Sequence, residues 1–273
     1  MITWHIFLYN KPRMPARSLK REMKTLTEGL ILKEQNIGEG DKLITALTVE
    51  KGLVKGFAKG AKNIKSQNCA GTQLFTYSRL CLIDSKSRDT YTISEAKAKQ
   101  QFFALGKSVE NMCLAQYFSE LIQSVLVFGE KNEEALSLIL NSLYLLSNGK
   151  RSPSLIKPCF EMRLLSICGY MPDLTMCSNC GEYNRDLFFF LPQTGTLYCN
   201  HCTSQDSLPK SIALDRGAIT ALRHTIYADD NKLFAFSLGK DGLEQLNRAS
   251  EEYVICQTER HYKTLDFYKS IKL

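Results

Sequence analysis

The spacing of apolar residues changes once along this 273-residue chain, near Gln100, and this change limits most strongly how the chain can fold. Up to about Ala96, apolar and polar residues alternate, as they do in half-buried β-strands. Beyond Gln100, apolar residues recur every three to four positions, as they do on one face of an α-helix. Strands followed by helices predict an α+β fold, because a parallel α/β sheet needs the two to alternate.

The first part of the chain is predicted to contain five short strands. Leu43, Thr45 and Leu47 alternate with residues of the other face, and a Glu-Lys-Gly turn follows, so residues 41–59 are predicted to form a β-hairpin. The other strand candidates are the apolar run 30–32 and the segments 74–84 and 89–96. Five strands in about 75 residues suit a small closed barrel better than a sandwich.

The second part is predicted to be helical on both sides of a cysteine-containing segment. Three helices are predicted most strongly: one that ends at Gly129, one from Asn132 to Ser147, and one from Ser154 to Cys168. In the third helix, Pro158 marks either a kink or the true first turn. Two weaker helices are predicted around residues 215–228 and 240–257. The domain organisation predicted from the residues is therefore a β-rich N-terminal part and a helical C-terminal part.

Four cysteines have the spacing of a structural metal site. Cys177, Cys180, Cys199 and Cys202 form the pattern C-x₂-C-x₁₈-C-x₂-C, which is typical of one tetrahedral, structural Zn²⁺. An apolar strand at 187–190 and a turn at 193–195 would bring the second pair back to the first. A redox or disulfide pair and a chance spacing are the alternatives, and His201 could replace one of the thiolates. Four thiolates leave no open position for catalysis.

The N-terminus and the remaining cysteines indicate the cell compartment. The apolar first ten residues precede the basic cluster, which is the wrong order for a secretory signal. Cytoplasm is therefore predicted, and ten cysteines are then not a disulfide framework. Because Met23 lies just before the first strand, residues 1–22 are predicted to be a disordered extension or a misassigned start. The sequence contains no run of about 18 apolar residues, so no membrane-spanning helix is predicted.

Positive charge gathers in the N-terminal part. Residues 1–110 hold 19 Lys+Arg against 10 Asp+Glu, whereas residues 111–273 hold 16 against 18. Residues 51–65 contain five lysines and no acid, and even spacing places Lys51, Lys55 and Lys59 on one strand face with Phe57. Phosphate-neutralising charges beside a stacking aromatic are what a barrel needs to bind a single strand. The alternative is a solvated edge strand whose lysines prevent aggregation. The predicted DNA contacts are Lys42, Lys51, Lys55, Phe57, Lys59, Lys62 and Lys65.

The sequence lacks the catalytic motifs that we sought. It contains no P-loop, no complete dinucleotide fingerprint, no H-E-x-x-H, no G-x-S-x-G and no deaminase signature. This favours a binding protein. Two other classes stay open: a zinc-dependent nucleic-acid enzyme with an accessory barrel, and a zinc-ribbon transcription regulator with a sequence preference on duplex DNA.

Two segments resemble the RecO family of bacterial DNA repair proteins. They are TEGLILKEQNIGEGDKLITALTVEKGLVKGFAKGAK at 27–62 and FEMRLLSICGYMPDLTMCSNCG at 160–181. The resemblance extends over nearly all of residues 24–270, in the same order of strands, helices and cysteines. The extension before Met23 departs from the family's pattern.

The resemblance implies a five-stranded OB-fold at residues 23–100 and a helical domain at 101–273 with a zinc-binding insertion at about 174–205. It also implies a recombination mediator that is not an enzyme, binds single- and double-stranded DNA, and anneals complementary strands. Such a protein acts with RecR to help RecA load onto DNA coated by single-strand-binding protein, whose C-terminal tail it contacts. For that acidic, apolar tail we expect an apolar pocket with a basic lip, for which Arg163 beside Phe160 and Leu164 is a candidate.

Overall fold

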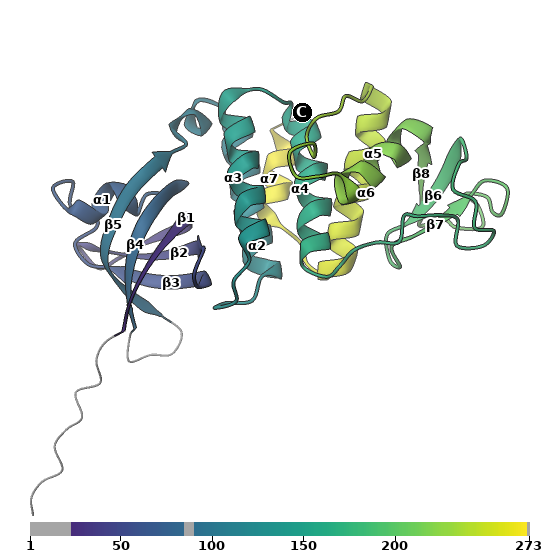
Figure 1. Cartoon of the computed structure of the whole chain (residues 1–273). Coiled ribbons are helices and arrows are strands. Elements are labelled where there is room, and N and C mark those ends of the chain that lie inside the picture. Colours follow the sequence, from purple (N-terminus) through teal and green to yellow (C-terminus); the bar gives the residue numbers. More distant parts are fainter. Residues whose placement is uncertain (1–22, 85–89, 272–273) are drawn as a thin grey trace, which may run out of the picture.

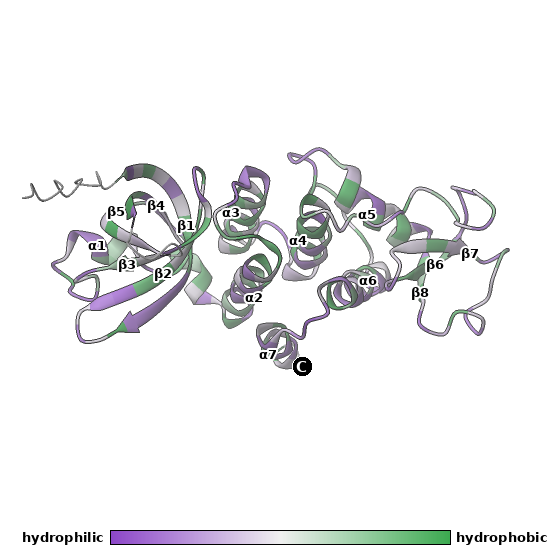
Figure 2. Ribbon diagram, turned by 90° about the horizontal axis from the view of Figure 1, so that it is seen from below, coloured by the Kyte–Doolittle hydropathy of each residue, from purple (hydrophilic) through white to green (hydrophobic). Residues whose placement is uncertain are grey.

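The structure is a computed structural model that describes residues 23–84 and 90–271. A β-barrel lies at one end, helices form the middle, and a small β-sheet lies at the other end, as two perpendicular views show (Figures 1 and 2). The predicted N-terminal extension, residues 1–22, lies outside the described residues.

The N-terminal part is a closed five-stranded barrel with the strand order β1-β2-β3-β5-β4. All neighbouring strands are antiparallel except β3 and β5, which are parallel. The predicted five-stranded barrel and the hairpin of β2 and β3 are therefore confirmed. A short helix, α1, joins β3 to β4. The elements are β1 (Lys24–Ile37), β2 (Asp41–Thr48), β3 (Gly52–Ala58), α1 (Gln67–Gly71), β4 (Thr76–Asp84) and β5 (Tyr91–Gln101).

The continuous apolar run in β1 has a structural reason, because the strand is buried on both faces. Ile31 points into the barrel interior, where it packs with Ile44 and Val54. Leu30 and Leu32 point outward and belong to the core that the helices form. The barrel and the helices thus share one continuous hydrophobic core.

The helical part begins with a short 3₁₀ helix at Phe103–Lys107 and continues through six α-helices. Side chains cap several of their N-termini: Ser108 accepts a hydrogen bond from the Asn111 amide, and Asn132 accepts one from the Ala135 amide. The helices are α2 (Val109–Val125), α3 (Glu133–Asn148), α4 (Pro153–Ile167), α5 (Arg216–Tyr227), α6 (Lys240–Thr258) and α7 (Lys263–Ser270).

Helix α4 lies at the centre of the helical part, where α2, α3, α5 and α6 all contact it. Pro153 is in its first turn, so Pro158 lies inside the helix rather than at its start. Its buried Lys157 and Glu161 form an ion pair of 3.0 Å, and the Tyr117 hydroxyl donates to Glu161 at 2.7 Å. These contacts compensate two charges that would otherwise be buried without a partner.

The far end of the molecule is an antiparallel three-stranded sheet with the order β7-β6-β8. It is formed by β6 (Leu187–Leu191), β7 (Thr196–Cys199) and β8 (Ile212–Asp215). The chain leaves the helices after α4 to form it and returns through α5. This arrangement confirms a four-cysteine element inserted into a helical domain. Within the described residues, no helix combines the length and apolar character needed to cross a membrane.

Candidate nucleic-acid interface and metal centre

The outer face of β3 carries two of the predicted DNA contacts. Lys55 and Phe57 are exposed, whereas the residues between and beside them are buried. Val54 and Ala58 fill the barrel interior, so the alternation of a strand turns Lys55 and Phe57 outward. Phe57 is 38% exposed, so its ring is accessible to a base beside the exposed Lys55.

Four more of the predicted contacts flank β3. Lys51 lies in the turn before the strand, and Lys59, Lys62 and Lys65 follow it. The loop after β3 is held by Asp41, whose carboxylate accepts from the Gly60 amide at 2.8 Å, and by Lys62, which donates to the Gly38 carbonyl at 3.2 Å. We call Lys51, Lys55, Phe57, Lys59, Lys62 and Lys65 the β3 surface.

The structure does not bring Lys42 to the β3 surface. Lys42 pairs across the ladder with Ala58, whose side chain points into the barrel, so Lys42 lies on the opposite face from Lys55 and Phe57. It is 9% exposed and forms an ion pair of 2.6 Å with Glu34. Lys42 was predicted as a DNA contact only because it is basic. The alternation of residues along β2 would have placed it on the inner face of the strand, away from Lys55 and Phe57.

We expect Lys42→Ala to leave DNA affinity and its salt dependence within twofold of the wild type, because its ammonium is already neutralised by Glu34. Titration of a labelled oligonucleotide at several salt concentrations checks this. A salt slope that becomes shallower by about 0.7, the value of one lost phosphate contact on a single strand, would place Lys42 back among the DNA contacts.

The loop between α2 and α3 is attached to β3, a contact that the sequence did not predict. The Gly129 amide donates to the Leu53 carbonyl at 2.9 Å, and Phe128 forms a parallel β-bridge with Leu53. A side chain at Gly52 would meet the Glu130 carbonyl oxygen at 1.7 Å, and Gly52 has a φ of +57°. Only glycine fits there, so the turn residue identified in the sequence also allows this close approach.

The four cysteines converge on one point. Their sulfur atoms all lie within 4.8 Å of one another, and the Cys180 and Cys199 sulfurs are 3.6 Å apart. A tetrahedral zinc with Zn–S bonds of 2.3 Å needs sulfurs about 3.8 Å apart. A disulfide needs about 2.05 Å, so this arrangement fits a metal and not an S–S bond. In the part of the chain that the structure describes, His201 does not belong to this cluster.

The local backbone explains why the cysteines converge. Gly181 has a φ of +71°, and its amide donates to the Cys177 carbonyl at 2.9 Å, which closes the first turn. Ser178 donates to the Leu197 carbonyl at 2.8 Å, so this turn is fastened to β7. The β6–β7 hairpin then places Cys199 at the end of β7.

Electrostatics at the cluster also favours a cation. Burial disfavours the Cys177 thiolate, but backbone amides of Cys180, Cys199 and Asn179 point at its sulfur and together lower the pKa of this thiol to about 6. Hydrogen bonds with the Cys180 and Cys199 sulfurs raise the pKa of Cys202 to about 12. Four thiols this close cannot all ionise without a positive charge among them, and a divalent cation supplies it.

Arg223 is a supporting residue of this element that the sequence did not indicate. It lies on α5, is 9% exposed, and donates to the Leu174 carbonyl at 2.7 Å and the Tyr183 carbonyl at 3.1 Å. Its guanidinium stacks on the Tyr183 ring at 4.0 Å. These contacts span both sides of the first cysteine pair and fix the segment to the helices.

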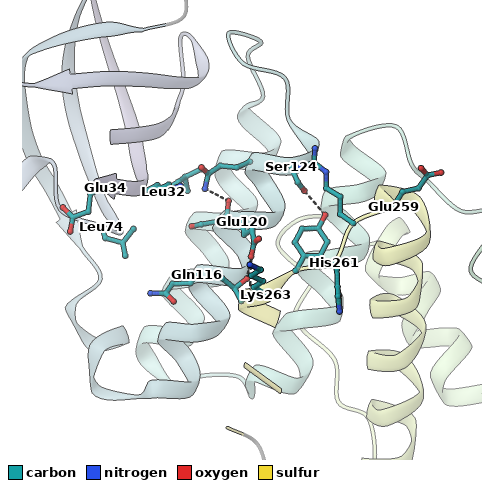
Figure 3. A pocket seen from close by; sticks show the side chains of 15 residues that line it. Leu32, Glu34, Leu74, Gln116, Glu120, Ser124, Glu259, His261 and Lys263 are labelled. Carbon is teal, nitrogen blue, oxygen red and sulfur yellow. Dashed lines mark hydrogen bonds between the residues drawn. The ribbon is translucent and has the colours of Figure 1, made fainter. Parts of the chain in front are cut away.

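A cavity of about 760 Å³ lies between the barrel, α2 and the connection from α6 to α7 (Figure 3). Its walls include Leu32 and Leu74 of the barrel and Tyr262, whose hydroxyl is 2.8 Å from that of Ser124. Exposed Lys33, Arg260 and Lys263 surround it, and none of them forms an ion pair with another described residue. Of the three acids that line it, Glu34 pairs with Lys42 and Glu120 accepts from Thr264, whereas Glu259 is exposed.

Arg163, which was expected to border an apolar pocket for the tail of single-strand-binding protein, instead joins two helices. Its Nε donates to the Thr225 carbonyl at 3.0 Å and its Nη1 pairs with Asp230 at 3.1 Å, which ties α4 to the end of α5. Phe160 and Leu164 are completely buried. Spacing along a helix cannot tell an exposed apolar face from one covered by other helices, so this expectation was wrong.

Known proteins resemble the chain over nearly its whole length. Residues 23–102 match the family described as "Recombination protein O N terminal", and residues 107–266 match "Recombination protein O C terminal". The chain is 33% identical over 245 residues to the DNA repair protein RecO of Acetivibrio thermocellus, covering 90% of this chain and 96% of that protein. It is 28% identical over 248 residues to RecO of Symbiobacterium thermophilum, covering 90% and 96%.

Proposed function

Because the chain belongs to the RecO family of DNA repair and recombination proteins, which are mediators and not enzymes, we propose that it binds single- and double-stranded DNA and anneals complementary strands. With RecR, it would help RecA load onto DNA that is coated by single-strand-binding protein. This work would be done in the cytoplasm, on the nucleoid.

The β3 surface is the observation that carries this proposal. Within residues 51–65 every charged side chain is a lysine, and Phe57 offers an aromatic face beside them. Lysines neutralise phosphates and an aromatic ring stacks on any base, so this combination binds single strands without sequence preference. Two neutralised strands that meet on such a surface can pair without nucleotide hydrolysis.

Annealing of complementary oligonucleotides tests the proposal. We expect pairing of strands coated with single-strand-binding protein to accelerate without ATP or a divalent metal. Covalent change of the labelled strands would instead indicate the zinc-dependent enzyme, and strong preference for one duplex sequence would indicate the transcription regulator. Either outcome would overturn the assignment.

We propose that residues 23–100 are the DNA-binding domain and that residues 101–273 are the domain for protein partners, with the insertion at about 174–205 holding one structural Zn²⁺. Cys177, Cys180, Cys199 and Cys202 would be its ligands. The ion would neutralise the thiolates and crosslink two turns that no disulfide joins. The barrel and the small sheet lie at opposite ends of the molecule, so the metal would act on folding and not on DNA directly (Figure 1).

The cavity beside α2 is the site that we propose for the tail of single-strand-binding protein. An acidic tail with apolar end residues needs an apolar wall and unpaired cations, and the cavity is lined by Leu32, Leu74 and Tyr262 together with Lys33, Arg260 and Lys263. Helix α4 does not offer such a site, because its Phe160 and Leu164 are completely buried.

Reversing the three charges at this cavity should abolish tail binding. We expect the K33E/R260E/K263E variant to bind a fluorescent peptide of the tail at least tenfold more weakly in an anisotropy titration, because three attractive contacts become repulsive. The matched control K150E/K210E/K240E reverses three exposed lysines of the helical part away from the cavity. Equal loss in both variants would show that only net charge matters and would contradict this site.

A further inference from the structure

We propose that Phe128 is a second base-stacking residue of the β3 surface, so that one DNA strand lies across the barrel and the α2–α3 loop together. This inference rests on the proposed binding of single-stranded DNA. It places a DNA contact in the helical part of the chain, where the sequence shows no excess of positive charge that would indicate DNA binding.

The backbone places Phe128 on the same face as the other contacts. Phe128 is the bridge partner of Leu53, and paired residues of neighbouring strands point to the same side of a sheet. Leu53, Lys55 and Phe57 alternate along β3 and share the outer side. The Lys55 Nζ lies 4.9 Å from the centroid of the Phe128 ring, which confirms that the two side chains meet there.

Phe128 is held in place although it is exposed. Its side chain is 45% exposed and that of the preceding Val127 is 59% exposed. The loop backbone is nevertheless fixed on both sides of Phe128: before it the Leu126 amide donates to the Ile122 carbonyl of α2 at 3.0 Å, and after it the Gly129 amide donates to the Leu53 carbonyl. An exposed ion pair of Lys131 with Glu50, at 2.7 Å, also joins the loop to the barrel. An apolar ring on a fixed loop loses little conformational entropy when a base stacks on it, which favours binding.

The spacing suits one continuous strand. Phe128 lies beside Leu53, and Phe57 follows Leu53 by four residues along β3, a distance of about 13 Å. Lys55 lies between the two rings, where a phosphate between two stacked bases would pass. Two acids lie near this path in sequence: Glu50 is already paired with Lys131, and Glu130, two residues after Phe128, is exposed.

A fluorescence experiment tests the contact directly. The single tryptophan of the chain is Trp4, so the W4F/F128W variant has one fluorophore, located at the proposed contact. We expect oligo-dT to quench this tryptophan, because a base that stacks on an indole quenches its emission. The W4F/F267W variant is the control, since Phe267 is also exposed but lies on α7. Binding of oligo-dT by W4F/F128W with no more quenching than the control would overturn the inference.

Affinity measurements separate this inference from the proposed function. We expect F128A to weaken single-strand binding between about fivefold and a hundredfold and to leave its salt slope unchanged, since stacking releases no counterions. F128L, which keeps an apolar side chain, should lose nearly as much, and duplex binding should hardly change. If K55A/K59A/K62A loses affinity while F128A and F128L do not, the inference fails and the proposed function stands. If none of these variants loses affinity, the proposed function fails as well.

Discussion

Replacing Lys55, Lys59 and Lys62 together by alanine should weaken binding of a single DNA strand by roughly ten- to a hundredfold at about 0.15 M salt. Each lysine that neutralises a phosphate releases counterions, and this release supplies most of the free energy of sequence-independent binding. The three side chains lie outside the barrel core, and Lys62 gives up only an exposed hydrogen bond to the Gly38 carbonyl, so the barrel should still fold.

The salt dependence provides the sharper measurement. If the wild type neutralises about five phosphates, the logarithm of its binding constant falls with log salt at a slope near −3.5, and three fewer contacts bring the slope to about −1.4. Between roughly 50 and 200 mM salt, the wild type then loses on the order of a hundredfold in affinity. The control K150A/K210A/K240A removes the same charge from the helical part and should keep the wild-type slope. A slope near zero for the wild type would rule out a phosphate-binding surface.

Removing one metal ligand is expected to have the largest effect on stability. Structural zinc contributes about 10–16 kcal/mol in small domains, as much as the whole stability of a typical protein. Cys177→Ala should therefore abolish metal binding and lower the melting temperature by more than about 10 °C, or make the protein insoluble. Metal analysis should find one zinc per chain in the wild type and none in the variant.

The matched control is Cys113→Ala. Cys113 is 4% exposed and Cys177 is 1% exposed, so both substitutions remove a buried sulfur, but Cys113 lies on α2 away from the cluster. It should keep its zinc and lose only a few degrees in melting temperature. A metal-free wild type that melts as the zinc-bound protein does would refute the structural role of the ion.

Patterns that repeat along the chain predicted most of the fold. The alternation from Leu43 to Phe57 predicted the β2–β3 hairpin, because one face of each strand is apolar and a glycine turn joins them. The helix from Asn132 was equally well marked, by its capping side chain at the start and Gly149, with a φ of +61°, at the end. The cysteine spacing predicted the cluster, since four ligands must converge on one point.

Elements too short to repeat a pattern were not predicted. Helix α1 has five residues and β8 has four, fewer than a periodicity needs. Helix α7 was missed as well, with eight residues and only Leu265 and Tyr268 buried. The contacts of Arg223 and Phe128 connect residues far apart in the chain, and one sequence carries no signal for such pairs.

The core that barrel and helices share determines how the molecule comes apart. Leu30, Leu47 and Leu53 of the barrel are completely buried in the same cluster as the helix residues. A fragment that ends after β5 would therefore expose a broad apolar surface and should aggregate. We do not expect this fragment alone to retain DNA binding. Heat should melt the barrel and the helices in a single cooperative transition, because unfolding either part would expose the apolar side chains of the other.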